Sequence, residues 1–214
     1  MSRITDDRIF YEAASKEIYK AVQSKLLLIT NKSKPEISKL ILQSLNNSET
    51  TKSLLSGKLR DDFGLFGNVA TVTINNIAKH ISENIEISIA KSKKSGVMLS
   101  ITVEVMPGDF KKILSVAGAT YNSRGGPVDW LEWLITRGTQ VVVGDYWLFP
   151  HAKGFTRSGG SSIMAEIKTI PRDPFRVDPN YAGTIDDNFI TRAIQAKADE
   201  ILDIVAIEID RSIK

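Results

Sequence analysis

Apolar side chains recur every three or four positions over the first third of the chain, which is the spacing of one helix face. The first such run covers residues 10–29. We predict that residues 31–34 (Asn-Lys-Ser-Lys) end this helix and that Pro35 opens a second one, because proline is favoured in the first helical turn. Ser48 is expected to cap a short third helix that Gly57 ends. The front of the chain is therefore predicted to be helical.

The apolar period shortens in the middle of the chain. Residues 68–78 alternate in places, but residues 77–85 also fit a helical turn, so strand and helix both stay open. Alternation is clear in residues 85–105, where two apolar–polar runs flank the turn "KSKKSG". This pattern predicts a β-hairpin with a basic tip formed by Lys91, Lys93 and Lys94.

Strands and one short helix follow the hairpin. Pro127 is expected to begin the helix "VDWLEWLITRG", and Gly138 is expected to stop it. Residues 139–149 and 161–170 are predicted to be two strands around the loop 151–162. This loop, "HAKGFTRSGGSS", would then lie at the tip of a second hairpin.

The chain is predicted to end in a long helix. Thr184 or Asp186 is expected to cap it, and its apolar stripe covers about seven turns. The fold class is therefore α+β, an antiparallel β-sheet with N-terminal helices and a long C-terminal helix. We predict a single domain: a helical part (1–64), a sheet with projecting hairpin and arm (65–183), and the C-terminal helix (184–214).

Composition narrows the possible classes of protein. Apolar residues make up 42% and charged residues 25%, which is ordinary for a globular domain. No apolar run is long enough to cross a bilayer, and the N-terminus lacks the pattern of an export signal, so no membrane partner is predicted. The chain contains no cysteine, which removes disulfides, thiol nucleophiles and cysteine metal sites.

Charge is mild overall but divided along the chain. The net charge is +3; residues 1–60 hold eleven Lys/Arg against six Asp/Glu, whereas residues 186–210 hold seven Asp/Glu against two Lys/Arg. A basic front and an acidic tail can pair within one chain or between copies. A groove that reads DNA sequence would be much more basic.

The loop 151–162 invites comparison with a phosphate-binding loop. Gly154 and Gly159 have the required spacing, but Gly160 stands where the lysine belongs, and the following segment resembles a strand instead of a helix. We therefore interpret the loop as an arm for contact between subunits. Its candidate contact residues are Lys153, Gly154, Arg157, Gly159 and Gly160.

Other candidate chemistry is sparse. His80 and Glu83 could offer two metal ligands on one helical turn, but no further His or Cys is near in sequence to complete a site. Asp61 and Asp62 are interpreted as helix-start residues, not as an acid–base pair. We predict no catalytic residue, no metal and no cofactor, and hence a structural protein and not an enzyme.

Several segments carry a family resemblance. "SLLSGKLRDDFGL" (53–65) resembles the G-x-L-R-x-x-[FI]-G stretch of the head–tail joining proteins of tailed bacteriophages, the neck and tail-completion group. "DWLEWLITRGTQVVVGDYWLFP", "TRSGGSSIM" and "FRVDPNYAGTIDDNFITRAI" resemble the C-terminal half of a virion structural protein of contractile-tailed phages. The resemblance covers about residues 50–214, and the N-terminal helices match only in type.

The resemblance implies a hexameric ring between portal and tail, in the virion after assembly in the host cytoplasm. Its partners would be copies of itself, the neighbouring portal (connector) and tail proteins, and genomic DNA that passes through the lumen without sequence readout. Ring closure needs heterologous contacts, which arms often supply. Lys91, Lys93 and Lys94 are the lumen candidates, and the acidic partners of the arm would be Asp199 and Asp203.

Other functions stay open at this point. A tail terminator or another tail protein is close to a neck role. A different class is a nucleic-acid-binding accessory domain that uses the lysine tip with Arg124 and Arg157. A hydrolase or nuclease would need Asp61 or Glu83 in catalysis.

Overall fold

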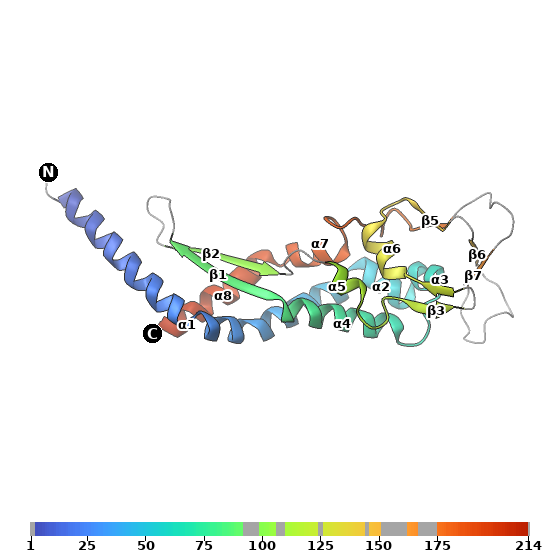
Figure 1. Ribbon diagram of the computed structural model, residues 1–214, viewed down its shortest axis with the longest axis horizontal. Helices are drawn as coiled ribbons and strands as arrows, with labels where there is room; N and C mark the ends of the chain where they lie inside the picture. The colour runs from blue at the N-terminus through green and yellow to red at the C-terminus, as the bar shows by residue number, and fades with distance from the viewer. Residues whose placement is uncertain are drawn as a thin grey trace. The chain divides into compact units, whose positions relative to one another are not determined.

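A computed structural model of the chain divides into two compact units (Figure 1). Unit 1 comprises Met1–Leu40, Ile81–Gly108 and Ala198–Lys214. Unit 2 comprises Ile41–His80 and Asp109–Lys197. The structure describes residues 3–91, 99–105, 110–123, 126–143, 146–150, 162–166 and 175–213. Unit 1 combines three separate segments of the sequence and unit 2 combines two. The expectation of a single domain stays a prediction.

The chain begins with one long helix, α1 (Arg3–Asn47), with Pro35 inside it. The predicted break at residues 31–34 was therefore wrong. An internal proline removes one backbone hydrogen bond and crowds the carbonyl four residues earlier, at a cost of roughly 3 kcal/mol. Burying one large aliphatic side chain contributes about 1.5–3 kcal/mol. Five such side chains on α1 are fully buried, so their packing outweighs the proline: Val22, Ile29, Ile37, Ile41 and Leu45.

Unit 1 contains the predicted hairpin, formed by β1 (Ile85–Lys91) and β2 (Leu99–Val105). The strands are antiparallel, with Ile87 opposite Val103 and Glu86 opposite Glu104. Ile87 is buried whereas Glu86 and Glu104 are exposed. The alternation of apolar and polar residues in the sequence therefore predicted correctly which face of the hairpin is buried.

The last helix of unit 1 is α8 (Ala198–Ile213), which packs along α1. The Lys25 ammonium donates to the carbonyl of Ser212 near the C-terminal end of α8. The predicted helix of seven turns is instead two helices, because α7 (Phe189–Gln195) ends before Ala196. Neither Ala196 nor Lys197 signals this break in the sequence, since both are good helix formers.

The cap of α7 also differs from the prediction. Asn188, and not Thr184 or Asp186, is the N-cap, and its side-chain oxygen accepts hydrogen bonds from the amides of Ile190 and Thr191. The Thr191 hydroxyl accepts from the Asn188 amide and completes a capping box. The Thr184 hydroxyl accepts from the Asp187 amide within the preceding turn.

Unit 2 contains five further helices among the described residues. They are α2 (Glu49–Ser56), α3 (Lys58–Phe63), α4 (Val69–Glu83), α5 (Phe110–Leu114) and α6 (Trp130–Thr136). One of them, α4, extends beyond His80, the last residue of the first segment of unit 2. The Ser48 cap and the Gly57 end of α2 are confirmed, with Ser48 Oγ accepting from the Thr51 amide at 3.1 Å. The ambiguous segment is helical from Val69 to Glu83, which is α4. Pro127 lies in a strand and does not begin a helix.

The strands of unit 2 make three antiparallel pairs among the described residues. They are β3 (Tyr121–Ser123) with β4 (Gly126–Val128), β5 (Val141–Val143) with β8 (Phe175–Arg176), and β6 (Tyr146–Pro150) with β7 (Ser162–Glu166). The α+β class is confirmed. Residues 139–149, predicted as one strand, contain β5 and β6, which pair with different partners.

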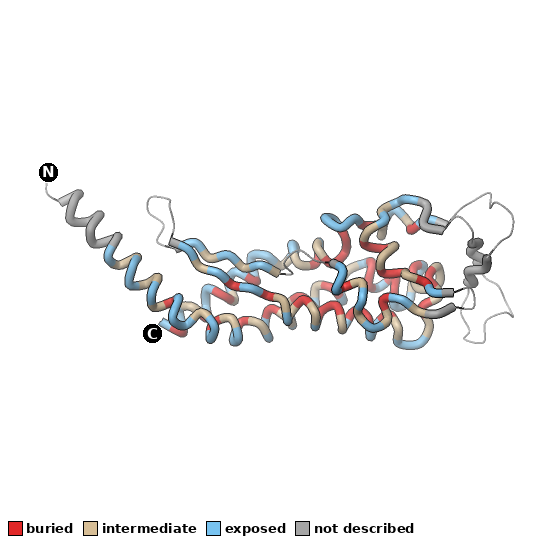
Figure 2. Tube along the Cα trace, in the orientation of Figure 1, coloured by how far each residue is buried: buried red, intermediate tan, exposed pale blue. Residues whose placement is uncertain are grey.

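The core of unit 2 centres on aromatic side chains. Trp130 is fully buried, and its ring centroid lies 6.0 Å from that of Phe63. The Trp130 indole N–H donates to the Gly118 carbonyl at 2.7 Å, so the polar atom of this large side chain is satisfied. Buried residues also follow α4 and α6 (Figure 2). This packing keeps the Trp130 ring inside the core and out of contact with other molecules.

We expect Pro35→Ala to stabilise the chain by about 1–3 kcal/mol, because alanine restores the backbone hydrogen bond in α1 and removes the ring clash. Urea unfolding followed by circular dichroism measures the change. The matched control is Glu36→Ala, an exposed neighbour, which should change the free energy of unfolding by less than about 0.5 kcal/mol. A destabilised Pro35→Ala chain would show that the fold depends on the irregularity at Pro35.

Candidate functional site

Of the predicted lumen residues Lys91, Lys93 and Lys94, the structure describes only the first. Lys91 is the last residue of β1 and pairs with Leu99 across the strands. Lys93 and Lys94 lie outside the described residues. The lumen role of all three therefore stays a prediction.

The predicted arm lies between β6 and β7. Its candidate contact residues all fall outside the described part of the chain: Lys153, Gly154, Arg157, Gly159 and Gly160. Their proposed partners Asp199 and Asp203 are described, and both are exposed on the first two turns of α8. The contact between arm and α8 stays a prediction.

The segment 53–65, which carries the family resemblance, forms a compact turn from α2 into α3. The Ser53 hydroxyl accepts a hydrogen bond from the Leu59 amide at 3.1 Å. A side chain at Gly57 would place its Cβ 2.8 Å from Ser53 Cα, so only glycine fits there. Gly64 ends α3 with a left-handed backbone, φ 66°. Ser53, Gly57 and Gly64 therefore have a structural role: they fix the turn between α2 and α3 and the end of α3.

A charged cluster joins this segment to a second segment of the resemblance. The Lys58 ammonium lies 2.6 Å from an Asp178 carboxylate oxygen. The hydrogen bond from Lys58 lowers the pKa of Asp178, and the Asn180 amide lowers it further. The sequence gives no sign of this pair, because no local signal connects residues so far apart in the chain.

Asp62 lies at the edge of the same cluster. Burial raises its pKa to about 6; Lys58 opposes this effect, and the charges of Asp178 and Asp61 add to it. Asp61 lies in the first turn of α3, but Gly57 is the N-cap, so neither aspartate caps the helix. A half-buried carboxyl can exchange a proton near neutral pH.

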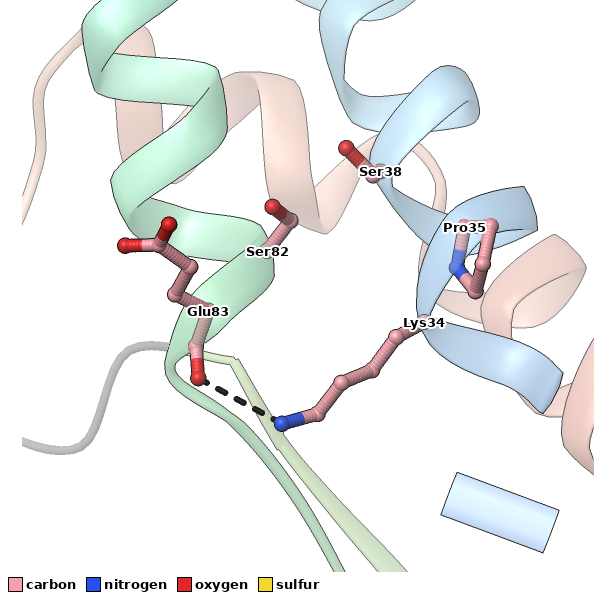
Figure 3. A pocket seen from close by; sticks show the side chains of 5 residues that line it. All are labelled: Lys34, Pro35, Ser38, Ser82 and Glu83. Atoms are coloured by element: carbon pink, nitrogen blue, oxygen red, sulfur yellow. Dashed lines mark hydrogen bonds between the residues drawn. The ribbon is translucent and has the colours of Figure 1, made fainter. Parts of the chain in front are cut away.

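An open hollow of about 370 Å³ lies beside Pro35 in unit 1 (Figure 3). Lys34, Pro35 and Ser38 line it from α1, and Ser82 and Glu83 line it from the end of α4. The Lys34 ammonium donates to the Glu83 carbonyl at 3.4 Å, while the Glu83 carboxylate points away from it. This contact places a positive charge at the negative end of the α4 dipole, which is a structural role.

Metal binding gains no support from the described side chains. Among them, no group of three or more His, Asp or Glu residues is placed to hold an ion. His80 and Glu83 both lie on α4, three positions apart.

Exposed apolar side chains mark unit 1 as a candidate contact surface. Its large exposed side chains among the described residues come from two helices only: Leu27 and Leu28 of α1, and Leu202, Ile207 and Ile213 of α8. Leu27 is 75% exposed. Single exposed hydrophobics are normal, but a group of them on adjoining helices is typical of a protein contact.

Neither the protein-family models, nor the curated proteins, nor the solved structures compared with the chain gave a match. In the part of the chain that the structure describes, no helix combines the length and the apolar character needed to cross a bilayer.

We expect Asp62→Asn to stabilise unit 2 more at pH 8 than at pH 4. The folded pKa of about 6 lies above the ordinary 3.8, so the native state binds more protons than the unfolded state between these values, and stability falls as pH rises through them. Because Asp62 is partly exposed, screening reduces the gain at pH 8 to roughly 1 kcal/mol.

Urea unfolding at several pH values measures this effect, with Asp186→Asn as the control because Asp186 is an exposed carboxylate of the same unit. A difference between Asp62→Asn and the parent chain that does not change with pH would contradict the assignment.

Proposed function

We propose that the chain is a virion structural protein that forms a closed hexameric ring at the head–tail junction of a tailed bacteriophage. The proposal that copies of the chain assemble is supported mainly by the exposed apolar side chains on α1 and α8 of unit 1. Leu27 is 75% exposed, and a chain that works as a monomer would gain nothing from exposing a large apolar side chain to this extent. The sequence resemblance of residues 50–214 supports the phage assignment.

In this proposal DNA passes through the lumen without being read. The net charge of +3 is compatible with passage, because tight binding to many phosphates would hold the DNA in place. Lys91, Lys93 and Lys94 would face the lumen, and the arm at 151–162 would contact the neighbouring subunit. The adjoining portal and tail proteins complete the list of partners.

A tail terminator or another tail protein would use the same assembly features, so it stays as a variant of this proposal. An alternative from a different class of function is a nucleic-acid-binding accessory domain. The lysine-rich sequence at the hairpin tip favours it, together with Arg124 and Arg157. The two classes differ in what the isolated chain binds: copies of itself or DNA.

We expect the purified chain to form closed six-fold rings when concentrated or when mixed with connector particles. Native mass measurement and electron microscopy of the same sample test this expectation. DNA binding by a chain that stays monomeric, with affinity falling steeply as salt rises, would favour the accessory domain instead. A chain that neither assembles nor binds DNA would contradict both proposals.

A further inference from the structure

Helix α8 has an apolar stripe that its own packing leaves uncovered. Its buried side consists of four residues spaced by four, three and four positions: Ile201, Val205, Glu208 and Ser212. One position further along the chain, with the same spacing, stand Leu202, Ala206, Ile209 and Ile213. These four lie about 100° around the helix from the buried side. Leu202 is 45% and Ile213 40% exposed, so this side of α8 lies open to a partner.

Carboxylates border this apolar stripe. Asp199, Asp203 and Asp210 share the next side of α8, and all three are exposed. Neither Asp199 nor Asp203 has an ion-pair partner among the described residues. We call the four apolar residues with these three aspartates the α8 stripe. Its chemistry suits a partner that carries both lysines and an apolar side chain.

Helix α1 carries a surface of that kind. Lys16, Lys20, Gln23 and Leu27 follow the same spacing of four, three and four, and all are exposed. We call them the α1 stripe. Leu27 comes five positions after the buried Val22 and two before the buried Ile29, so it points away from the packed side of α1. Leu27 is the most exposed large apolar side chain of the described chain.

We propose that the α1 stripe of one copy binds the α8 stripe of the next copy. Lys16 and Lys20 would meet Asp199 and Asp203, and Leu27 would pack on the apolar residues of α8. The equal spacing of the two stripes lets the helices lie along one another. The occupant is therefore a second copy of this chain.

Both stripes stay available when the chain is folded. Within one chain, Lys25 binds the Ser212 carbonyl, and Val22, Ile29 and Val205 are buried. Lys20 pairs with Glu17 on the same helix at 2.9 Å, but both side chains are exposed and a surface pair of this kind contributes little, so Lys20 can exchange Glu17 for a carboxylate of another copy. Each copy can therefore bind one neighbour through α1 and another through α8. Such a heterologous contact produces a ring when its rotation closes and a filament when it does not. Closure into a ring rests on the proposed function, whereas the pairing of the stripes does not.

Nucleic acid is the other conceivable partner of the α1 stripe. A phosphate backbone would satisfy Lys16 and Lys20 but would leave Leu27 in water. It would also leave the acidic α8 stripe without a partner. Pairing between copies covers both stripes at once, which favours it.

Charge reversal tests the pairing directly. We expect Lys16→Glu/Lys20→Glu and Asp199→Lys/Asp203→Lys each to raise the concentration needed for self-association on the order of 100-fold, because like charges then face one another. An equimolar mixture of the two variants should associate like the parent chain, since each acidic stripe again meets a basic one. A chain with all four substitutions should do the same alone. Sedimentation velocity over a concentration series measures all four samples.

Two control variants change charge elsewhere. Lys111→Glu/Lys112→Glu and Glu36→Lys/Asp186→Lys reverse exposed charges outside the stripes and should associate like the parent. Thermal melting checks that each variant folds. Because Asp199 lies in the first turn of α8, where a lysine opposes the helix dipole, Asp203→Lys alone replaces the double variant if that variant melts early.

The outcomes separate this inference from the proposed function. Rings that form equally well in both double variants would overturn the stripe pairing and leave the ring intact. Loss of association that neither the mixture nor the fourfold variant restores would also overturn the pairing. So would a loss of association in Lys16→Glu/Lys20→Glu without a loss in Asp199→Lys/Asp203→Lys. A parent chain that stays monomeric at every concentration would overturn both.

Discussion

The structure depends on the burial of one side of α1. Most of the stability of a helix in a protein comes from the tertiary packing of its apolar side and not from helix propensity. Its buried residues before position 41 belong to unit 1 and those from Ile41 onward belong to unit 2, so each unit is built around its own part of the helix. In unit 2 the Ser44 hydroxyl donates to the Ala193 carbonyl at 2.9 Å and ties α1 to α7. The opposite side of α1 is exposed, and its side chains can therefore contact other molecules.

Local signals in the sequence predicted local structure well. Alternation defined the hairpin because β1 and β2 have one buried face, and Ser48 with Gly57 defined α2 because caps act within one turn. The break at residues 31–34 was wrong for an instructive reason. Asn31 and Lys32 lie on the exposed side of α1 and Ser33 is a small buried residue, so a polar run was mistaken for a turn. Pro35 strengthened that error, although packing on both sides of it holds the helix together.

Contacts between distant segments could not be predicted in this way. The ion pair of Lys58 with Asp178, and the burial that raises the pKa of Asp62 to about 6, arise only when α3 and the segment after β8 come together. The division of charge between the front and the tail of the chain was visible in the sequence. Its consequence was not, because only the structure shows that Asp199 and Asp203 are exposed beside an uncovered apolar stripe. The phage resemblance stays a proposal that rests on the sequence.

The central claim is that α1 of one copy meets α8 of another, and cysteine cross-linking tests it most directly. The chain has no cysteine of its own, so Leu27→Cys and Ile213→Cys can be made singly, purified with different tags and mixed with a short thiol cross-linker. Ile213 is the exposed apolar residue of the α8 stripe that lies nearest to Leu27 when Lys16 and Lys20 meet Asp199 and Asp203. The account predicts a cross-linked product that carries both tags, with little product from either variant alone, and none when Ile185→Cys of unit 2 replaces Leu27→Cys. Cross-links that join only like variants, or no cross-links in assembled material, would contradict it.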